Sequence, residues 1–150
     1  MESHLEQMRG VLITLQGGKL LLPNTTVSEI ISYIAPESVS DKPDWYLGAI
    51  RWKGYRLPLV SLSAVLGWPG IESSSGAKIS ILKALSGESK MPYYAILTQG
   101  FPRLVNVASD KLLDDPEHNS EFYYSAYLND EAVTVPDLER VETLIREHHI

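Results

Sequence analysis

Short runs of alternating apolar and polar residues, each followed by a turn signal, constrain this chain most strongly. Residues 11–16 alternate in this way, which is the periodicity of a β-strand. The pair Gly17-Gly18 follows, and glycine accepts the positive φ angles of a tight hairpin turn. Alternation then resumes and ends at Pro23, which cannot donate to a strand ladder. Residues 10–23 are therefore predicted to form a β-hairpin.

The same pattern recurs to the end of the chain. It predicts a helical turn near 24–28 and strands at 29–34, 47–52, 55–62, 78–85, 93–98, 101–107, 122–128 and 132–135. Ser61 is placed to cap a short helix over 63–66, whereas 69–77 is predicted to be an exposed loop and 110–121 to be irregular. Asp137 is predicted to begin an amphipathic helix. About nine short strands with little helix predict an all-β barrel or sandwich.

The composition excludes several classes of protein. The 150 residues fit one domain, residues 1–150, which can bury a core without disulfides. With no cysteine, the chain has no thiol chemistry and no cysteine-based metal site. Its 19 acidic residues outnumber the 13 basic ones, for a net charge of −6, so a nucleic-acid partner is not expected. The N-terminus lacks an apolar signal region and no apolar run reaches about 18 residues, which predicts a cytoplasmic protein without membrane insertion.

Motifs that carry catalysis or bind cofactors are missing. The sequence contains no G-x-S-x-G, P-loop, G-x-G-x-x-G or H-E-x-x-H pattern. The adjacent His148 and His149 would point apart on a helix, so no metal site is expected there. Asp114, Asp115 and Glu117 lie in one predicted loop, whereas a hydrolase holds two carboxylates across a cleft. The sequence therefore predicts neither an enzyme nor a protein with a cofactor or metal.

Basic and aromatic residues cluster around the second predicted hairpin. Arg51, Lys53 and Arg56 either guard an edge strand or form a charged patch that steers an acidic partner. Five aromatic residues crowd between positions 45 and 68. Most of these rings are expected in the core, and one or two exposed rings would fit a protein-binding surface.

The same hairpin carries a family resemblance. Residues 48–62, Gly-Ala-Ile-Arg-Trp-Lys-Gly-Tyr-Arg-Leu-Pro-Leu-Val-Ser-Leu, resemble the signature of the CheW-like family. Leu66-Gly67 and the upstream run Val27-Ser28-Glu29-Ile30 are also similar to segments of that family. Residues 94–107 and 133–138 match more weakly, so the resemblance spans roughly residues 10–147.

The resemblance implies a fold and a role. The fold would be all-β, with two interlocked five-stranded SH3-like barrels, one over about 24–75 and one over 10–23 plus 76–136, and then a helix at 137–148. Members of the family are adaptors without catalytic activity. They couple methyl-accepting chemoreceptors to the regulatory domain of a CheA-type histidine kinase. The alternative is a divergent CheW-like regulator that binds another protein of the pathway without bridging receptor and kinase.

Site residues follow from the resemblance position by position. Contact roles fall on Glu29, Gly48, Lys53 and Gly54, while Val27 and Ile30 would line an apolar groove. Arg51 joins this protein-binding set through the basic patch. Each assignment has a simpler alternative, because glycine can be required by a positive φ or by close packing, and the two apolar residues can belong to the core.

Three residues depart from the family pattern. Lys53 stands where the family has Arg, and Ser61 and Gln99 stand where it has Asp. Lysine keeps the charge of arginine but loses its planar fork of donors. If the residues at 53 and 61 normally form an ion pair, this chain has lost that pair. With these departures the chain is more similar to ChpC-type adaptors of chemosensory systems for type IV pili and twitching than to a flagellar adaptor.

Overall fold

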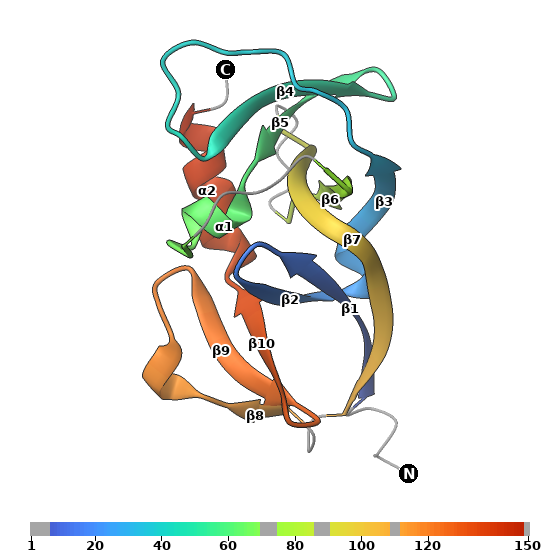
Figure 1. Cartoon of the computed structure of the whole chain (residues 1–150), viewed down its shortest axis with the longest axis vertical. Helices are drawn as coiled ribbons and strands as arrows, with labels where there is room; N and C mark the ends of the chain where they lie inside the picture. The colour runs from blue at the N-terminus through green and yellow to red at the C-terminus, as the bar shows by residue number, and fades with distance from the viewer. Residues whose placement is uncertain (1–6, 70–74, 86–90, 109–111, 149–150) are drawn as a thin grey trace.

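A computed structural model describes residues 7–69, 75–85, 91–108 and 112–148. The described strands are β1 (Gln7–Leu15), β2 (Gly18–Pro23), β3 (Val27–Ser32), β4 (Tyr46–Trp52), β5 (Tyr55–Val60), β6 (Ala77–Lys83), β7 (Tyr93–Ala108), β8 (Leu112–Asp114), β9 (Tyr123–Leu128) and β10 (Glu131–Pro136). The helices are α1 (Leu62–Val65) and α2 (Leu138–His148), with 3₁₀ turns η2 (Asn24–Thr26) and η4 (Pro116–His118) (Figure 1). The predicted all-β class is confirmed.

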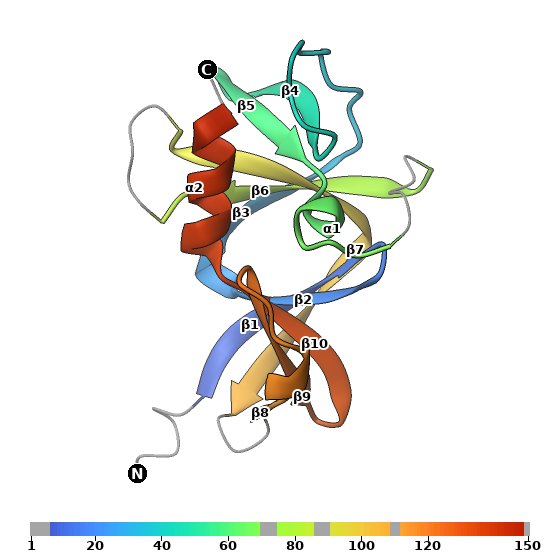
Figure 2. The same cartoon turned by 90° about the vertical axis from the view of Figure 1, so that its left-hand side faces the viewer.

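The strands form one continuous sheet rather than two closed barrels. Within the described residues the hydrogen-bonded order is β3-β6-β7-β1-β2-β10-β9-β8, with β5 on β7 and β4 on β5. Figures 1 and 2 show β8, β9 and β10 at the opposite end of the molecule from β4 and β5. β6 pairs with β3, so strands that we assigned to different subdomains lie side by side. The division into two subdomains itself stays a prediction.

Strand β7 corrects the expectation of two strands at 93–98 and 101–107. It runs without a break over 16 residues. Opposite β1 the register shifts, because Leu12 pairs with Arg103 while Thr14 pairs with Gln99. Pro102 lies inside this bulge, where the ladder requires no donor from it. The proline therefore bends the strand without ending it.

Two further expectations need correction. The segment 110–121 was expected to be irregular, but Leu112–Asp114 forms β8 and pairs with β9. A strand of three residues is too short to show a periodic pattern.

The first hairpin turns at Gln16-Gly17 rather than at Gly17-Gly18, because Leu15 pairs with Gly18. A Cβ on Gly18 would lie 3.0 Å from the ring of Trp68, so close packing explains the second glycine.

The core explains why the first hairpin is apolar on both faces. Alternate residues of β1 and β2 enter two different clusters of buried side chains. One cluster, which also includes α1 and α2 residues, contains Val11, Ile13, Leu15, Leu20 and Leu22. The other contains Leu12 and Leu21 together with β9 and β10 residues. The hairpin is therefore sandwiched between two parts of the core.

Short helices begin as the sequence predicts. The Ser61 hydroxyl accepts a hydrogen bond from the Ala64 amide at 3.4 Å and caps α1. Asp137 accepts one from the Arg140 amide at 3.3 Å at the start of α2. No helix in the described part of the chain has the length and apolar character needed to cross a membrane.

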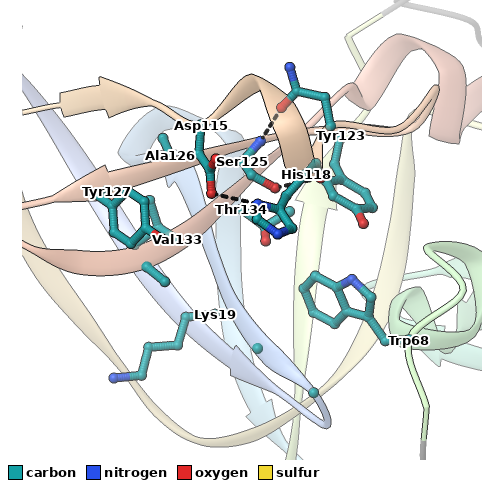
Figure 3. A pocket seen from close by; sticks show the side chains of 14 residues that line it. Lys19, Trp68, Asp115, His118, Tyr123, Ser125, Ala126, Tyr127, Val133 and Thr134 are labelled. Carbon is teal, nitrogen blue, oxygen red and sulfur yellow. Dashed lines mark hydrogen bonds and ion pairs between the residues drawn. The ribbon is translucent and has the colours of Figure 1, made fainter.

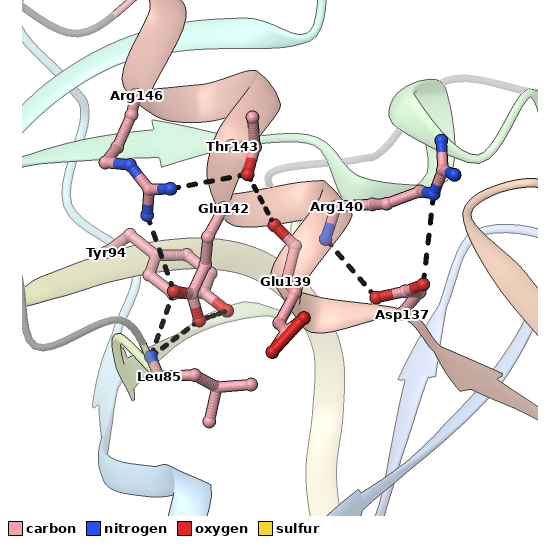
Figure 4. Close-up of polar contacts among 8 residues, drawn as sticks. All are labelled: Leu85, Tyr94, Asp137, Glu139, Arg140, Glu142, Thr143 and Arg146. Carbon is pink, nitrogen blue, oxygen red and sulfur yellow. Dashed lines mark hydrogen bonds and ion pairs between the residues drawn. The ribbon is translucent and has the colours of Figure 1, made fainter.

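A buried carboxylate that the periodic pattern does not reveal anchors α2 (Figure 4). Glu142 is only 1% exposed, and its two oxygens accept hydrogen bonds from the Leu85 amide at 2.9 and 2.8 Å. The Tyr94 hydroxyl donates to Glu142 at 3.4 Å, and the Arg146 guanidinium lies 3.8 Å away. Burial, reinforced by the Glu142 carboxylate, holds the pKa of Tyr94 well above its usual value.

Replacing this carboxylate is expected to destabilise the fold. In Glu142→Gln, an amide NH₂ group would face the Leu85 amide, so donors would oppose one another in a buried site. We expect the free energy of unfolding in urea to fall by about 1–3 kcal/mol. Glu139→Gln, on the exposed side of the same helix, is the matched control. Equal effects of the two changes would contradict the anchoring role.

The raised pKa of Tyr94 predicts a loss of stability in alkali. The folded state holds the Tyr94 proton more tightly than the unfolded state, so this stabilisation is complete below about pH 10 and is lost as pH rises through the folded pKa. Urea unfolding between pH 8 and 11 should show this decline, and Tyr94→Phe should reduce its slope. Tyr124→Phe changes an exposed ring and is the control. An unchanged slope in Tyr94→Phe would assign the decline to other groups.

Candidate functional site

Three side chains meet where β3 faces the tip of the β4–β5 hairpin. Glu29 Oε1 accepts a hydrogen bond from Trp52 Nε1 at 3.1 Å and lies 3.4 Å from Lys53 Nζ. The Lys53 ammonium also lies 5.2 Å from the centroid of the Trp52 ring. β3 pairs with β6 and not with the hairpin, so this contact joins strands that are not hydrogen-bonded neighbours. The structure thus brings Glu29 and Lys53, two predicted site residues, together.

Three aromatic rings, those of Trp52, Tyr55 and Tyr93, pack against one another beside this contact. Trp52 is 8% exposed and belongs to the core cluster under the hairpin. Its ring centroid lies 6.3 Å from that of Tyr55 and 5.0 Å from that of Tyr93. Tyr55 pairs directly with Trp52 across the hairpin and is 42% exposed. Most of the crowded aromatics are buried or half-buried, as expected, and Tyr55 supplies an exposed ring.

The two predicted glycines serve different needs. Gly48 has a φ of +143°, and a Cβ there would lie 2.3 Å from the Glu37 carbonyl oxygen. That carbonyl accepts from the Ala49 amide at 3.0 Å, so the chain at Glu37 packs against β4. Gly54 has a φ of +84° in the hairpin turn and open space around it. Close packing and a positive φ together explain Gly48, whereas turn geometry alone explains Gly54.

Basic side chains occupy the other face of the hairpin. Arg51 and Arg56 form a directly opposed pair on β4 and β5, and both are exposed. Arg56 Nε lies 3.4 Å from Glu37 Oε1. Because side chains alternate along a strand, these two arginines point away from the side that carries Trp52. Positive charge thus surrounds the hairpin tip on both faces.

A bulge in β3 divides the remaining predicted residues. Its register against β6 shifts between Val27 and Glu29, which puts Val27 and Ile30 on the face opposite Glu29. Val27 and Ile30 are half-buried and line a pocket of about 190 Å³. The pocket also includes Leu104 of β7, which is 62% exposed. Apolar and charged site residues therefore lie on different sides of the same strand.

A larger hollow lies away from the predicted residues, where β9 and β10 face Trp68 and the β1–β2 turn (Figure 3). It measures about 520 Å³, and Trp68 and Tyr123 form one wall of it. Asp115 Oδ2 lies 2.8 Å from His118 Nδ1, while the Ser125 hydroxyl donates to the His118 carbonyl oxygen rather than to its ring. The sequence drew attention to the acid cluster but not to this hollow. Among the described residues, no three acidic or histidine side chains are grouped to hold a metal.

Comparison with known proteins identifies the family. A family model described as the CheW-like domain matches residues 9–144. The chain belongs to the CheW-like family. Among solved structures, it is similar to the scaffolding protein TtCheW from Thermoanaerobacter tengcongensis, with a TM-score of 0.74 and 16% identity over 87% of this chain and 89% of that chain. At this identity the likeness shows the fold alone. A search of curated proteins finds no match.

The departures from the family pattern are independent of each other in the structure. Lys53 lies in the turn before β5, and Ser61 follows the other end of that strand. Ser61 caps α1, and Lys53 pairs with Glu29. In this chain the two residues therefore have separate partners, and the loss of an ion pair between positions 53 and 61 stays a prediction. The partner of Lys53 comes from β3, a segment that the resemblance had singled out separately.

Substitution of the two glycines should separate their roles. Both changes meet the backbone cost of a positive φ, about 1–2 kcal/mol, but Gly48→Ala must in addition displace the Glu37 carbonyl. We expect Gly48→Ala to lower the free energy of unfolding by more than Gly54→Ala does. Urea unfolding of both variants checks this order. A smaller loss for Gly48→Ala would contradict the close-packing explanation.

Proposed function

We propose that this protein is a non-enzymatic adaptor that couples a chemoreceptor to the regulatory domain of a CheA-type histidine kinase in the cytoplasm. The observation that carries the proposal is the contact of Glu29, Trp52 and Lys53 at the hairpin tip. This contact is built from the two segments that carry the resemblance to the CheW-like family. A hairpin whose exposed, charged tip contacts a neighbouring strand suits a protein-binding role better than a catalytic one.

Charge and exposed aromatic surface both support binding at this tip. Arg51, Lys53 and Arg56 are exposed around it in a protein whose net charge is −6. A local positive patch on an acidic protein can orient an acidic partner during encounter. Tyrosine and arginine are also enriched among residues that dominate binding energy, and the hairpin exposes Tyr55 on one face and Arg51 on the other.

Bridging requires two surfaces that do not overlap. The bulge in β3 supplies a physical basis for them, because Glu29 faces the hairpin tip while Val27 and Ile30 line the pocket with Leu104. We infer that the charged tip binds the kinase and that the apolar pocket binds the receptor. The regulator alternative uses only one of these surfaces.

The departures at Lys53, Ser61 and Gln99 lead us to propose a type IV pilus pathway rather than a flagellar one.

Calorimetric titration with the kinase regulatory domain and with a cytoplasmic receptor fragment tests this proposal. Lys53→Glu reverses the charge at the tip and is expected to weaken kinase binding by about tenfold or more. Arg140→Glu, the same charge change on the exposed first turn of α2, is the matched control. Circular dichroism checks that each variant is folded.

The second arm of the same experiment changes the apolar pocket. Leu104→Asp should weaken the receptor and leave the kinase bound, while Leu113→Asp, at an equally exposed leucine on β8, should change neither. If Lys53→Glu and Leu104→Asp both weaken binding of one and the same partner, the regulator alternative is favoured. If neither partner binds the unchanged protein, the adaptor proposal is overturned.

A further inference from the structure

The carboxylate of Glu29 contacts two neighbouring residues of one hairpin, accepting a hydrogen bond from Trp52 and forming an ion pair with Lys53. Trp52 Nε1 lies 3.1 Å and Lys53 Nζ 3.4 Å from the same oxygen, Oε1. The Lys53 and Glu29 side chains are 68% and 41% exposed, and an exposed pair of this kind is screened by water and held weakly. Lysine is also a point charge on a flexible stem, so it does not define the position of a carboxylate as the fork of an arginine does.

We propose that Trp52 is a positioning residue that fixes the carboxylate of Glu29 for its pairing with Lys53. Its indole N–H donates to Glu29 from a fixed direction, which the flexible ammonium of lysine does not define and the planar fork of an arginine would. The consequence for binding rests on the proposed adaptor function, whereas the consequence for the side chains does not. This role depends on the N–H donor of Trp52 and is separate from the contribution of its ring to core packing.

The surroundings of Trp52 suit this role. Its ring is held by Tyr55 and Tyr93 and by the core cluster under the hairpin, so the indole N–H has a fixed direction. The Lys53 ammonium lies over the same ring at 5.2 Å, where cation–π attraction restrains the lysine as well. One buried side chain thus restrains both members of an exposed ion pair.

Rescue by arginine separates positioning from simple packing. Trp52→Phe keeps an aromatic ring but removes the N–H donor, and we expect it to weaken binding of the kinase regulatory domain by about three- to tenfold. Lys53→Arg added to Trp52→Phe should restore most of that affinity, because the guanidinium offers two donors to Glu29. Tyr93→Phe, which removes a polar group from the same ring cluster, is the matched control. Failure of arginine to rescue would overturn the proposal.

A readout without the partner keeps the two proposals distinguishable. The NMR signal of the Trp52 indole N–H should exchange with solvent faster in Glu29→Ala than in the unchanged protein, while Glu37→Ala should leave it as it was. Equal exchange in all three proteins would overturn the inference even if the kinase binds. If the indole N–H exchanges faster in Glu29→Ala than in the unchanged protein but the kinase does not bind, the positioning role is upheld and only the proposed function is rejected.

Discussion

The pairing of β7 with β1, β5 and β6 is the interaction on which the other elements depend. The first part of β7 pairs with β6 and, in parallel, with β5, and the second part of β7 pairs with β1. Through these contacts the 16-residue strand connects the hairpin that carries the candidate site to the β1–β2 hairpin at the centre of the core. The bulge at Pro102 gives the bend that this double attachment requires, since a straight strand would not follow both groups of partners.

Local chemistry made much of the fold predictable, because adjacent strands need only a turn between them. Lys53 and Gly54, and likewise Asn129 and Asp130, have the paired positive φ angles of two-residue hairpin turns at the positions where turns were expected. The cap at Ser61 is equally local. The joining of 93–98 and 101–107 into one strand, β7, was not predictable in this way. Pro102 is tolerated inside the strand only because the register of β1 against β7 shifts at that point.

Long-range polar contacts lie outside the reach of periodicity. Glu142 interrupts the apolar pattern of α2, and that pattern gives no sign that it is buried, yet the Leu85 amide and Tyr94 converge on it. In the candidate site, the resemblance selected Glu29 and Lys53 from separate segments, but it could not show that they touch or that Trp52 joins them. Such contacts depend on how the sheet curves, which no single segment encodes.

The substitution of lysine for arginine at position 53 becomes understandable once its neighbours are considered together. An isolated exposed lysine–glutamate pair orders neither side chain strongly. Here the carboxylate is held by a buried indole, and the ammonium rests over the same ring. The restraint that a planar guanidinium would supply through its own geometry is therefore transferred to the preceding residue of the hairpin. A surface can keep an ordered charge in this way while its cation changes, provided that the buried residue beneath it keeps a donor.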